Sequence, residues 1–470
     1  MRVNGYFLVL LFLFSCSEKG NPAGGGDTDS DPIDVSGKIY VTDQGSNRVI
    51  IIDGNSSSLE VLKTIAIDYD SEMDNCMSYD SEMSCNMASG CEWMMGMCME
   101  STVDCSFDNM QDCMSSSGCE WNDSMSMCME SDSNGGMSMG SIPHFIEIDE
   151  TNGYWFVTAF GTGEVGMYSL EDDSFISSVN VGSSPALMVL DEPSMTLYVS
   201  RMMDMNNGSM VMEGGDNELF VLSYESGSLI SSGSINLASN LPSFPSPHAL
   251  SISSNSTLGN TIYTASNTAD IVAKITNNGS SIEHFVIDPN ITDLNSGVLE
   301  IQRLNPIQSV QSENFVYITC SANSSGQWQA DSGDYYPVNG QVVMFNIVSN
   351  TLVDIHEFVY DDGYHSPWHM VKSPNSEEIY VTLGSGSVAC LEYNEGSGNL
   401  SQKWVSSDSG FGTLHGIAVS PDGSYLYVSS RSNGSVHKIN ASNGELVYSK
   451  NGLAEAGMMG ALTGIAIVQE

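Results

Sequence analysis

Four histidines could do chemistry together, because they occupy matching places in segments that repeat along this 470-residue chain. His144, His248 and His415 each directly precede a short apolar run. In a fourth such segment Trp368 takes that place and His369 follows it. Imidazoles that converge from several segments could hold zinc or copper, or could place one ring as a general base. The alternative is structural, with rings that pack or hydrogen-bond inside the fold. His365 lies near His369, and the remaining histidines, His284, His356 and His437, fall on other strands of the pattern, where we expect exposed rings.

Sulfur-bearing residues gather in one segment, residues 68–140, which holds fifteen of the 28 methionines. Ser-Gly-Cys-Glu-Trp occurs twice there, at Ser89–Trp93 and Ser117–Trp121, so the segment is an internal duplication. Thiolate and thioether groups suit Cu(I). Cysteines in fours, with few large apolar residues around them, are also typical of small disulfide-stapled modules in exported proteins. We therefore predict disulfides among its eight cysteines, with a soft-metal role as the alternative: Cys76, Cys85, Cys91, Cys98, Cys105, Cys113, Cys119 and Cys128.

The elements that must position these residues are β-strands, and one strand pattern occurs seven times in the chain. Each run is aromatic and β-branched, and most are followed by a Gly/Asn/Ser turn and a second apolar run. A repeat of about 40–45 residues with four short strands predicts a β-propeller. The seven runs are 39–42, 156–158, 197–200, 262–264, 316–319, 379–382 and 426–429.

The last repeat shows the four strands, A to D, most clearly. Residues 417–423 predict the innermost strand A and a turn, 425–429 predict B, 435–439 predict C, and 446–449 predict the outer strand D. The pattern GIAVSPDG–YLYVSS–GSVHKIN resembles the YVTN-type (YncE-like) β-propeller repeat. The resemblance implies the fold over residues 38–468 and says little about activity.

The two ends of the repeat region complement each other. The first repeat begins at strand B, residues 38–42, with no strand A before it. The chain ends with residues 462–468, which match strand A and nothing more. We predict an all-β, seven-bladed propeller that the C-terminal strand closes, since closure removes the sheet edges that favour aggregation.

The added loops are predicted to share one face with the start of strand A. The Cys/Met-rich insertion, residues 68–140, joins strand D of one blade to strand A of the next. Two long loops between strands B and C, residues 201–217 and 321–339, reach the same face. Loops on a rigid scaffold often carry function, so we expect binding residues at the channel mouth on this face: Met202, Met203, Met205, Trp328, Tyr335 and Tyr336.

The N-terminus predicts export. Arg2 precedes a short apolar run, which is too short to span a bilayer. The ending Leu13-Phe14-Ser15-Cys16 resembles the bacterial lipobox, which implies cleavage before Cys16 and lipid attachment to its thiol. We therefore expect a signal peptide over residues 1–15 and a Gly/Asp/Ser tether over 16–37. The predicted location is the bacterial cell envelope, as an outer-membrane lipoprotein held by its lipid alone.

The net charge of the chain limits the kinds of partner that it can bind. The chain has 13 basic and 58 acidic residues, a formal charge of −45, which disfavours nucleic acid. It contains no nucleophile elbow, phosphate loop, HExxH or CxxCH motif. We therefore expect a binding module for a protein, glycan or small ligand rather than an enzyme. A copper-handling protein and a propeller lactonase are the alternatives, and no cofactor is implied beyond copper or zinc.

Overall fold

The computed structural model describes residues 37–469, with gaps. The gaps are 70–90, 95–96, 101–118, 123–126, 131–139, 183, 202–203, 207–208, 212–216, 240, 256–258, 277–278, 288–303, 323–326, 330–334, 361–362 and 455–460. The predicted signal peptide, Cys16 and nearly all of the tether lie outside the described residues. No helix among the described residues is long and apolar enough to cross a membrane.

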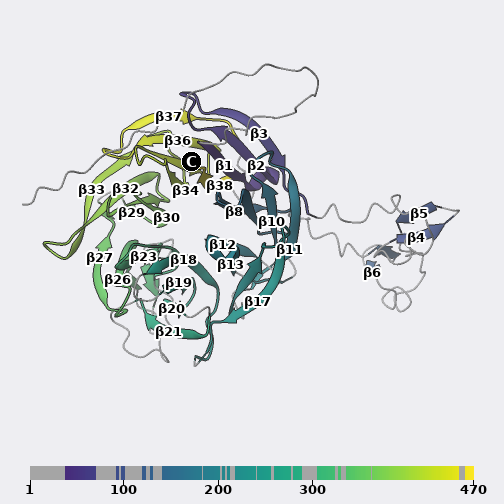
Figure 1. The fold of residues 1–470 in the computed structure, drawn as a ribbon, viewed down its shortest axis with the longest axis horizontal. Coiled ribbons are helices and arrows are strands. Elements are labelled where there is room, and N and C mark those ends of the chain that lie inside the picture. The colour runs from purple at the N-terminus through teal and green to yellow at the C-terminus, as the bar shows by residue number, and fades with distance from the viewer. Residues whose placement is uncertain are drawn as a thin grey trace, which may run out of the picture. The chain divides into compact units, whose positions relative to one another are not determined.

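Seven four-stranded antiparallel sheets form the blades of a β-propeller (Figure 1). Blades 1 to 3, from inner to outer strand, are β38 (Leu462–Ile467), β1 (Lys38–Asp43), β2 (Arg48–Asp53), β3 (Glu60–Ala66); β8 (Pro143–Asp149), β9 (Tyr154–Ala159), β10 (Glu164–Ser169), β11 (Phe175–Asn180); and β12 (Pro185–Asp191), β13 (Thr196–Arg201), β16 (Glu218–Ser223), β17 (Ile230–Asn236). Blades 4 and 5 are β18 (Pro247–Asn255), β19 (Gly259–Ser266), β20 (Ile271–Thr276), β21 (Ser281–Val286); and β22 (Pro306–Gln311), β23 (Phe315–Cys320), β26 (Gln341–Asn346), β27 (Leu352–Glu357). Blades 6 and 7 are β30 (Pro367–Lys372), β31 (Glu378–Leu383), β32 (Ser387–Asn394), β33 (Asn399–Ser407); and β34 (Leu414–Val419), β35 (Tyr425–Ser430), β36 (Ser435–Asn440), β37 (Leu446–Lys450).

The predicted closure is confirmed. Strand β38 pairs antiparallel with β1, with Ile39 opposite Ile467 and Val41 opposite Ile465. Each inner strand also contacts the inner strands of the two neighbouring blades, so the seven form a ring. The apolar core lies between blades: Ile39 and Ile50 of blade 1, for example, share one buried cluster with Tyr427 of blade 7.

The inner strands share a local irregularity near their start. Five of them begin with proline, and in each the pairing register shifts within the next three residues. Proline lacks an N–H, so it is tolerated where a strand begins or bulges. The bulge places the second residue of each inner strand, the position of the predicted histidine ring, at the seam between two blades.

A hydroxyl side chain bridges the blades at nearly every seam. Thr382 of β31 accepts a hydrogen bond from the His369 backbone N–H of its own blade (3.0 Å) and donates one to the His415 carbonyl of the next (2.6 Å). Thr382, the last residue of the repeated run 379–382, thus joins blade 6 to blade 7. Equivalent bridges run from Thr42 to His144, Thr158 to Ala186, Ser200 to His248, Thr319 to Trp368 and Ser429 to Thr463.

Blade 4 makes its bridge differently. The pairing register places Ala265 where the other blades have threonine or serine. The carbonyl of Ile307 in blade 5, which a hydroxyl would otherwise contact, instead bonds the imidazole Nδ1 of His248 at 2.5 Å. Because a carbonyl can only accept, Nδ1 is the donor, and His248 completes the ring of seven seams.

The additions to the propeller fall between the strands predicted for them. Two-stranded hairpins β14–β15 (Asp204–Asn206, Ser209–Val211) and β24–β25 (Gln327–Gln329, Tyr335–Pro337) lie between strands B and C of blades 3 and 5. The side chains of Met205, Trp328, Tyr335 and Tyr336 are outside the description, as are Met202 and Met203 altogether. A further hairpin, β28–β29 (Val359–Tyr360, Gly363–Tyr364), precedes blade 6.

The duplicated insertion contains two matching hairpins, β4–β5 (Cys91–Met94, Met97–Glu100) and β6–β7 (Cys119–Asn122, Met127–Glu130). Their registers are the same, with Trp93 opposite Cys98 and Trp121 opposite Cys128. This agreement supports the duplication that the sequence predicts. The side chains of all eight insertion cysteines lie outside the described residues, so the disulfides stay a prediction.

Two cysteines lie within the blades. Cys320 and Cys390 are both buried and form no disulfide. They belong to different core clusters, Cys320 with Val316 and Ile318, and Cys390 with Tyr380. A bridge between adjacent blades, which their spacing left open, is therefore absent.

The hydroxyl bridges predict a measurable stability effect. Thr382→Val keeps the shape of the side chain but leaves a buried N–H and a buried carbonyl without a partner, so we expect a loss of about 3 kcal/mol in the free energy of unfolding. Urea unfolding measures it. Thr351→Val, at an exposed turn, is the control and should change little. A loss for Thr382→Val no greater than the control's would contradict the role of the bridges.

Candidate functional site

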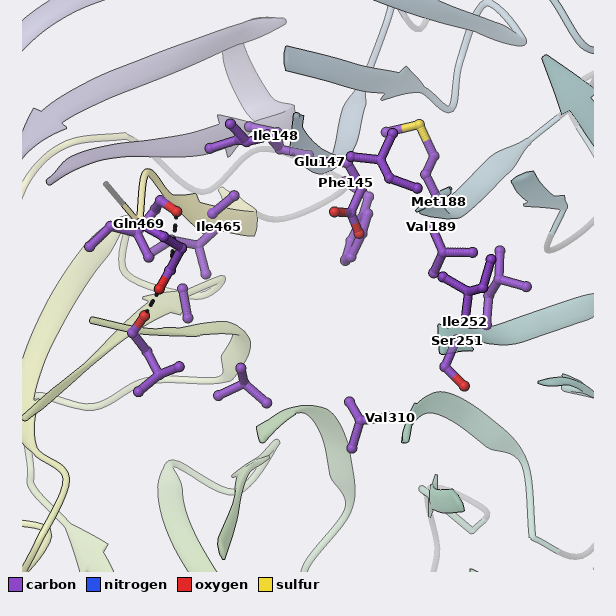
Figure 2. A pocket seen from close by; sticks show the side chains of 18 of the residues that line it. Phe145, Glu147, Ile148, Met188, Val189, Ser251, Ile252, Val310, Ile465 and Gln469 are labelled. Atoms are coloured by element: carbon purple, nitrogen blue, oxygen red, sulfur yellow. Dashed lines mark hydrogen bonds between the residues drawn. The ribbon is translucent and has the colours of Figure 1, made fainter. Parts of the chain in front are cut away.

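A cavity of about 790 Å³ occupies the centre of the ring and is lined by residues from all seven inner strands. Alternation turns the fifth residue of each inner strand toward it. Figure 2 shows four of these side chains around the opening: Glu147, Val189, Ser251 and Val310. The other three fifth-position residues are Val371, Ala418 and Ala466. Glu147 is therefore the one charged group at this level of the described channel.

The floor of the cavity is aromatic. Phe145 of blade 2 stacks on His369 of blade 6, with ring centroids 6.1 Å apart and planes 24° apart. Both are third residues of inner strands and meet across the axis. Two other third positions are glycines: a Cβ at Gly464 would lie 2.9 Å from the Phe145 Cα, and one at Gly416 would lie 2.3 Å from the Thr463 carbonyl oxygen. Their missing side chains let the backbones of neighbouring inner strands approach closely.

The histidine layer lies beneath this floor. The His369 and His415 ring centroids are 4.4 Å apart, and His144 and His415 are 5.6 Å apart. The four histidines are 3–8 % exposed, so the prediction that they line an open channel mouth is wrong. Their convergence is confirmed, but the second-position rings close the channel because the strands draw together at the bulges. None of the four is among the residues that line the cavity.

Burial keeps these imidazoles neutral. Desolvation lowers the pKa of His248 to about 4 and that of His369 to about 3. The pKa values of His144 and His415 are also well below the usual range, first through desolvation and then through repulsion from the neighbouring histidines and Arg431. The His144 Nδ1 bonds the Gln44 amide nitrogen at 2.8 Å, whereas the His415 Nδ1 is buried with no hydrogen-bond partner.

The described residues do not support the predicted metal centre. They include no group of three or more His, Cys, Asp or Glu side chains that could hold a metal ion. One member of the set, His248, already uses its Nδ1 in the blade 4 to blade 5 bridge. The Met-rich loops fall largely outside the description, so a soft-metal role for them stays a prediction. The expectation of an exposed His437 is wrong: it is fully buried, with Nδ1 bonded to the Ser449 hydroxyl at 2.9 Å.

The cavity opens on the face opposite to the predicted one. Glu150, Thr151 and Glu192, which line it, lie at the turns that follow the inner strands of blades 2 and 3. The long B–C loops and the Cys/Met-rich insertion are connected at the other ends of the strands. The described cavity thus opens away from the end that carries the long loops, and the binding role of those loops stays a prediction.

Glu147 is the site residue that the sequence reasoning missed. Its carboxylate is half-buried, and no described residue donates a hydrogen bond to it. Desolvation, followed by repulsion from Glu192, raises its pKa to about 8. The available signal was its position, since Glu147 is the one acidic residue at the fifth place of the seven inner strands. The predicted histidine ring included His144, which lies three residues before Glu147 on the same strand.

The opposite wall carries neutral polar groups. The Ser251 hydroxyl accepts hydrogen bonds from Ser309 (2.8 Å) and from the Gln311 amide (3.0 Å). The Gln308 Oε1 accepts one from the Met370 backbone N–H at 2.7 Å, which orients the amide side chain. The cavity thus combines three carboxyl groups, of which Glu147 alone stands at the fifth-position level, with a few hydroxyls and amides and apolar walls, as small-molecule sites commonly do.

Comparison with known proteins agrees with this fold. The family model "Lactonase, 7-bladed beta-propeller" matches residues 339–456. No curated protein matches the chain significantly. A functionally unknown protein from Desulfotomaculum acetoxidans DSM 771 is similar in structure, with a TM-score of 0.52, 14 % identity, and coverage of 92 % of this chain and 99 % of that one. The periplasmic gluconolactonase PpgL of Pseudomonas aeruginosa gives a TM-score of 0.51 at 16 % identity, with 70 % and 88 % covered. At such identities the two structures show a shared fold and no more.

The buried histidines predict acid sensitivity. In the unfolded chain a histidine takes up a proton near pH 6.5, whereas in the fold His248 does so near pH 4. The unfolded state therefore binds more protons, and stability that is complete above pH 6.5 is lost as the pH falls, by about 2 kcal/mol per histidine at pH 5. Urea unfolding at pH 7 and pH 5 measures this loss. The His415→Phe variant should lose less than the parent, because burial holds the pKa of His415 well below its usual range and the variant lacks this group. Equal losses in the two proteins would refute the assignment.

Proposed function

We propose that this protein binds a small molecule in the central cavity, at the mouth lined by Glu150, Thr151 and Glu192. The observation that carries the proposal is a cavity within the ring of inner strands, with Glu147 as the one carboxyl group among the seven fifth-position side chains of its wall. A packed hub would have filled this volume with side chains. Instead, three of the seven fifth-position residues that face it are alanine or serine: Ser251, Ala418 and Ala466.

The cavity disfavours anions. Its lining includes Glu147, Glu150 and Glu192, and no lysine, arginine or histidine. The chain as a whole carries a formal charge of −45, which adds to the repulsion. Phosphorylated or carboxylated ligands are therefore poor candidates, and neutral or cationic ones are favoured.

The proposed setting is the cell envelope. It is supported by the apolar N-terminal run and the lipobox-like Leu13–Cys16, which would tether the propeller to an outer membrane. In this arrangement the Met-rich and aromatic B–C loops face away from the cavity mouth and are available to a protein or glycan partner. Detection of a lipid-modified Cys16 peptide by mass spectrometry tests the anchor, and an unmodified Cys16 in the mature envelope protein would overturn it.

A lactone hydrolase is the second candidate, favoured by the family model that matches residues 339–456. In such a reaction, ionised Glu147 would remove a proton from water while the oxygen forms a bond to the lactone carbonyl carbon. The ring C–O bond then breaks, and the proton passes to the leaving alkoxide. Gln308 lines the same cavity and could donate a hydrogen bond to the carbonyl oxygen.

Blocking the cavity tests the binding proposal. Val310 points into the opening (Figure 2), so Val310→Trp should place a large ring in the cavity and weaken ligand binding without unfolding the blades. A thermal-shift screen of neutral sugars, lactones and organic cations measures binding. Val447→Trp, on the exposed outer strand β37, is the matched control and should retain every ligand. Ligands that bind the blocked variant as well as the parent would refute the cavity as the site.

Lactone hydrolysis predicts a substrate preference and a pH dependence that can be measured. We expect glucono-δ-lactone to be opened and its 6-phosphate to be rejected, and we expect Glu147→Gln to slow the reaction about a hundredfold, the usual contribution of a general base. The rate should rise with pH through about 8, the pKa of Glu147, since the ionised carboxylate is the base. A pH-stat assay measures it, with Glu445→Gln as the control. Equal rates for Glu147→Gln and the parent would exclude this candidate.

A further inference from the structure

The cavity lacks a positive charge to balance Glu147. Buried carboxylates are normally paired with a cation or held by several hydrogen bonds. Glu147 has neither among the described residues, and its nearest charged neighbour, Glu192, repels it. The positive charge that would pair with Glu147 therefore has to come from a bound ligand.

The surroundings of Glu147 suit one kind of partner. Phe145, two residues before it on β8, presents its ring at the cavity floor, and both side chains are directed into the opening (Figure 2). An aromatic face and a carboxylate together favour an ammonium group. Next to them, Met188, Val189 and Ile252 of blades 3 and 4 offer an apolar wall. We propose that the cavity binds an organic monocation, an ammonium with an apolar body, whose positive centre lies between Glu147 and Phe145.

The other titratable groups around the site are consistent with this. Glu192 comes from the turn after β12, and Glu150 from the turn after β8, where it accepts a hydrogen bond from the Gln469 backbone N–H. Below the floor, burial lowers the pKa of His369 to about 3, so its ring is neutral at physiological pH. No described lining residue opposes a cation. A bare metal ion is a poor fit, since the described residues include no group of three or more His, Cys, Asp or Glu side chains that could hold one.

Protonation of Glu147 is coupled to this binding. With a pKa of about 8, the Glu147 carboxyl group of the empty site is mostly protonated at pH 7. A permanent cation favours the ionised carboxylate, so binding should release about one proton, and affinity should rise between pH 7 and 9. A neutral ligand of the same shape should release none.

The test compares choline with 3,3-dimethylbutan-1-ol, which has the same shape without the charge, by isothermal titration calorimetry on the whole protein. We expect choline to bind at least tenfold more tightly and to release a proton, as measured in buffers of different ionisation enthalpy. Glu147→Gln should reduce choline affinity to that of the alcohol and leave the alcohol unchanged. Glu147→Asp should restore part of the preference, and Glu445→Gln, outside the cavity, should match the parent.

The outcomes separate this inference from the proposed function, on which it rests. If sugars or lactones bind the parent and fail to bind Val310→Trp, while choline binds no better than the alcohol, the cavity is a ligand site and the cation assignment is wrong. If choline binds Glu147→Gln as tightly as the parent, the role of Glu147 is overturned. If no probe of any class binds, both proposals fail.

Discussion

The hydroxyl bridges between neighbouring blades are the interaction on which the rest of this structure depends. Each joins the bulge of one inner strand to a carbonyl of the next blade, as Thr382 does between His369 and His415. Both bonded backbone groups are buried, so losing the hydroxyl would leave two polar groups unsatisfied. The bridges therefore tie each blade to the next at the hub, while apolar clusters fill the wedges between blades farther out.

This constraint also explains why the channel is open at one end only. The bulges and bridges draw the strand starts together, so that second- and third-position side chains meet across the axis as the histidine layer and the Phe145 floor. Beyond them the strands diverge, and small fifth-position residues leave the cavity. His248 shows that the hub tolerates a different donor where Ala265 removes the hydroxyl, provided that the Ile307 carbonyl is still bonded.

The chemistry of the cavity follows from Glu147, the one acidic residue among the fifth-position residues of the inner strands. Glu147 stands in a wall otherwise made of apolar and neutral polar side chains, under the field of Glu192 and of a strongly acidic protein. Such a carboxyl group is costly to ionise alone, and this cost makes it selective for a ligand that compensates the charge or a reaction that uses its proton. The decorated loops and the cavity mouth lie at opposite ends of the strands, so ligand binding and partner binding need not compete.

The sequence by itself determined the seven blades, the closing C-terminal strand and the convergence of the histidines, because alternation and repeat length are local properties that the ring only has to accommodate. The Thr or Ser that ends each repeated run was visible there too, though its bridging role was not. Only the tertiary structure decided which end of the channel is open, that the histidines are buried hub residues, and that Glu147 faces a cavity whose lining includes no basic residue. These facts depend on how far seven strands from distant parts of the chain stand apart at each level of the axis, and no local pattern encodes that distance.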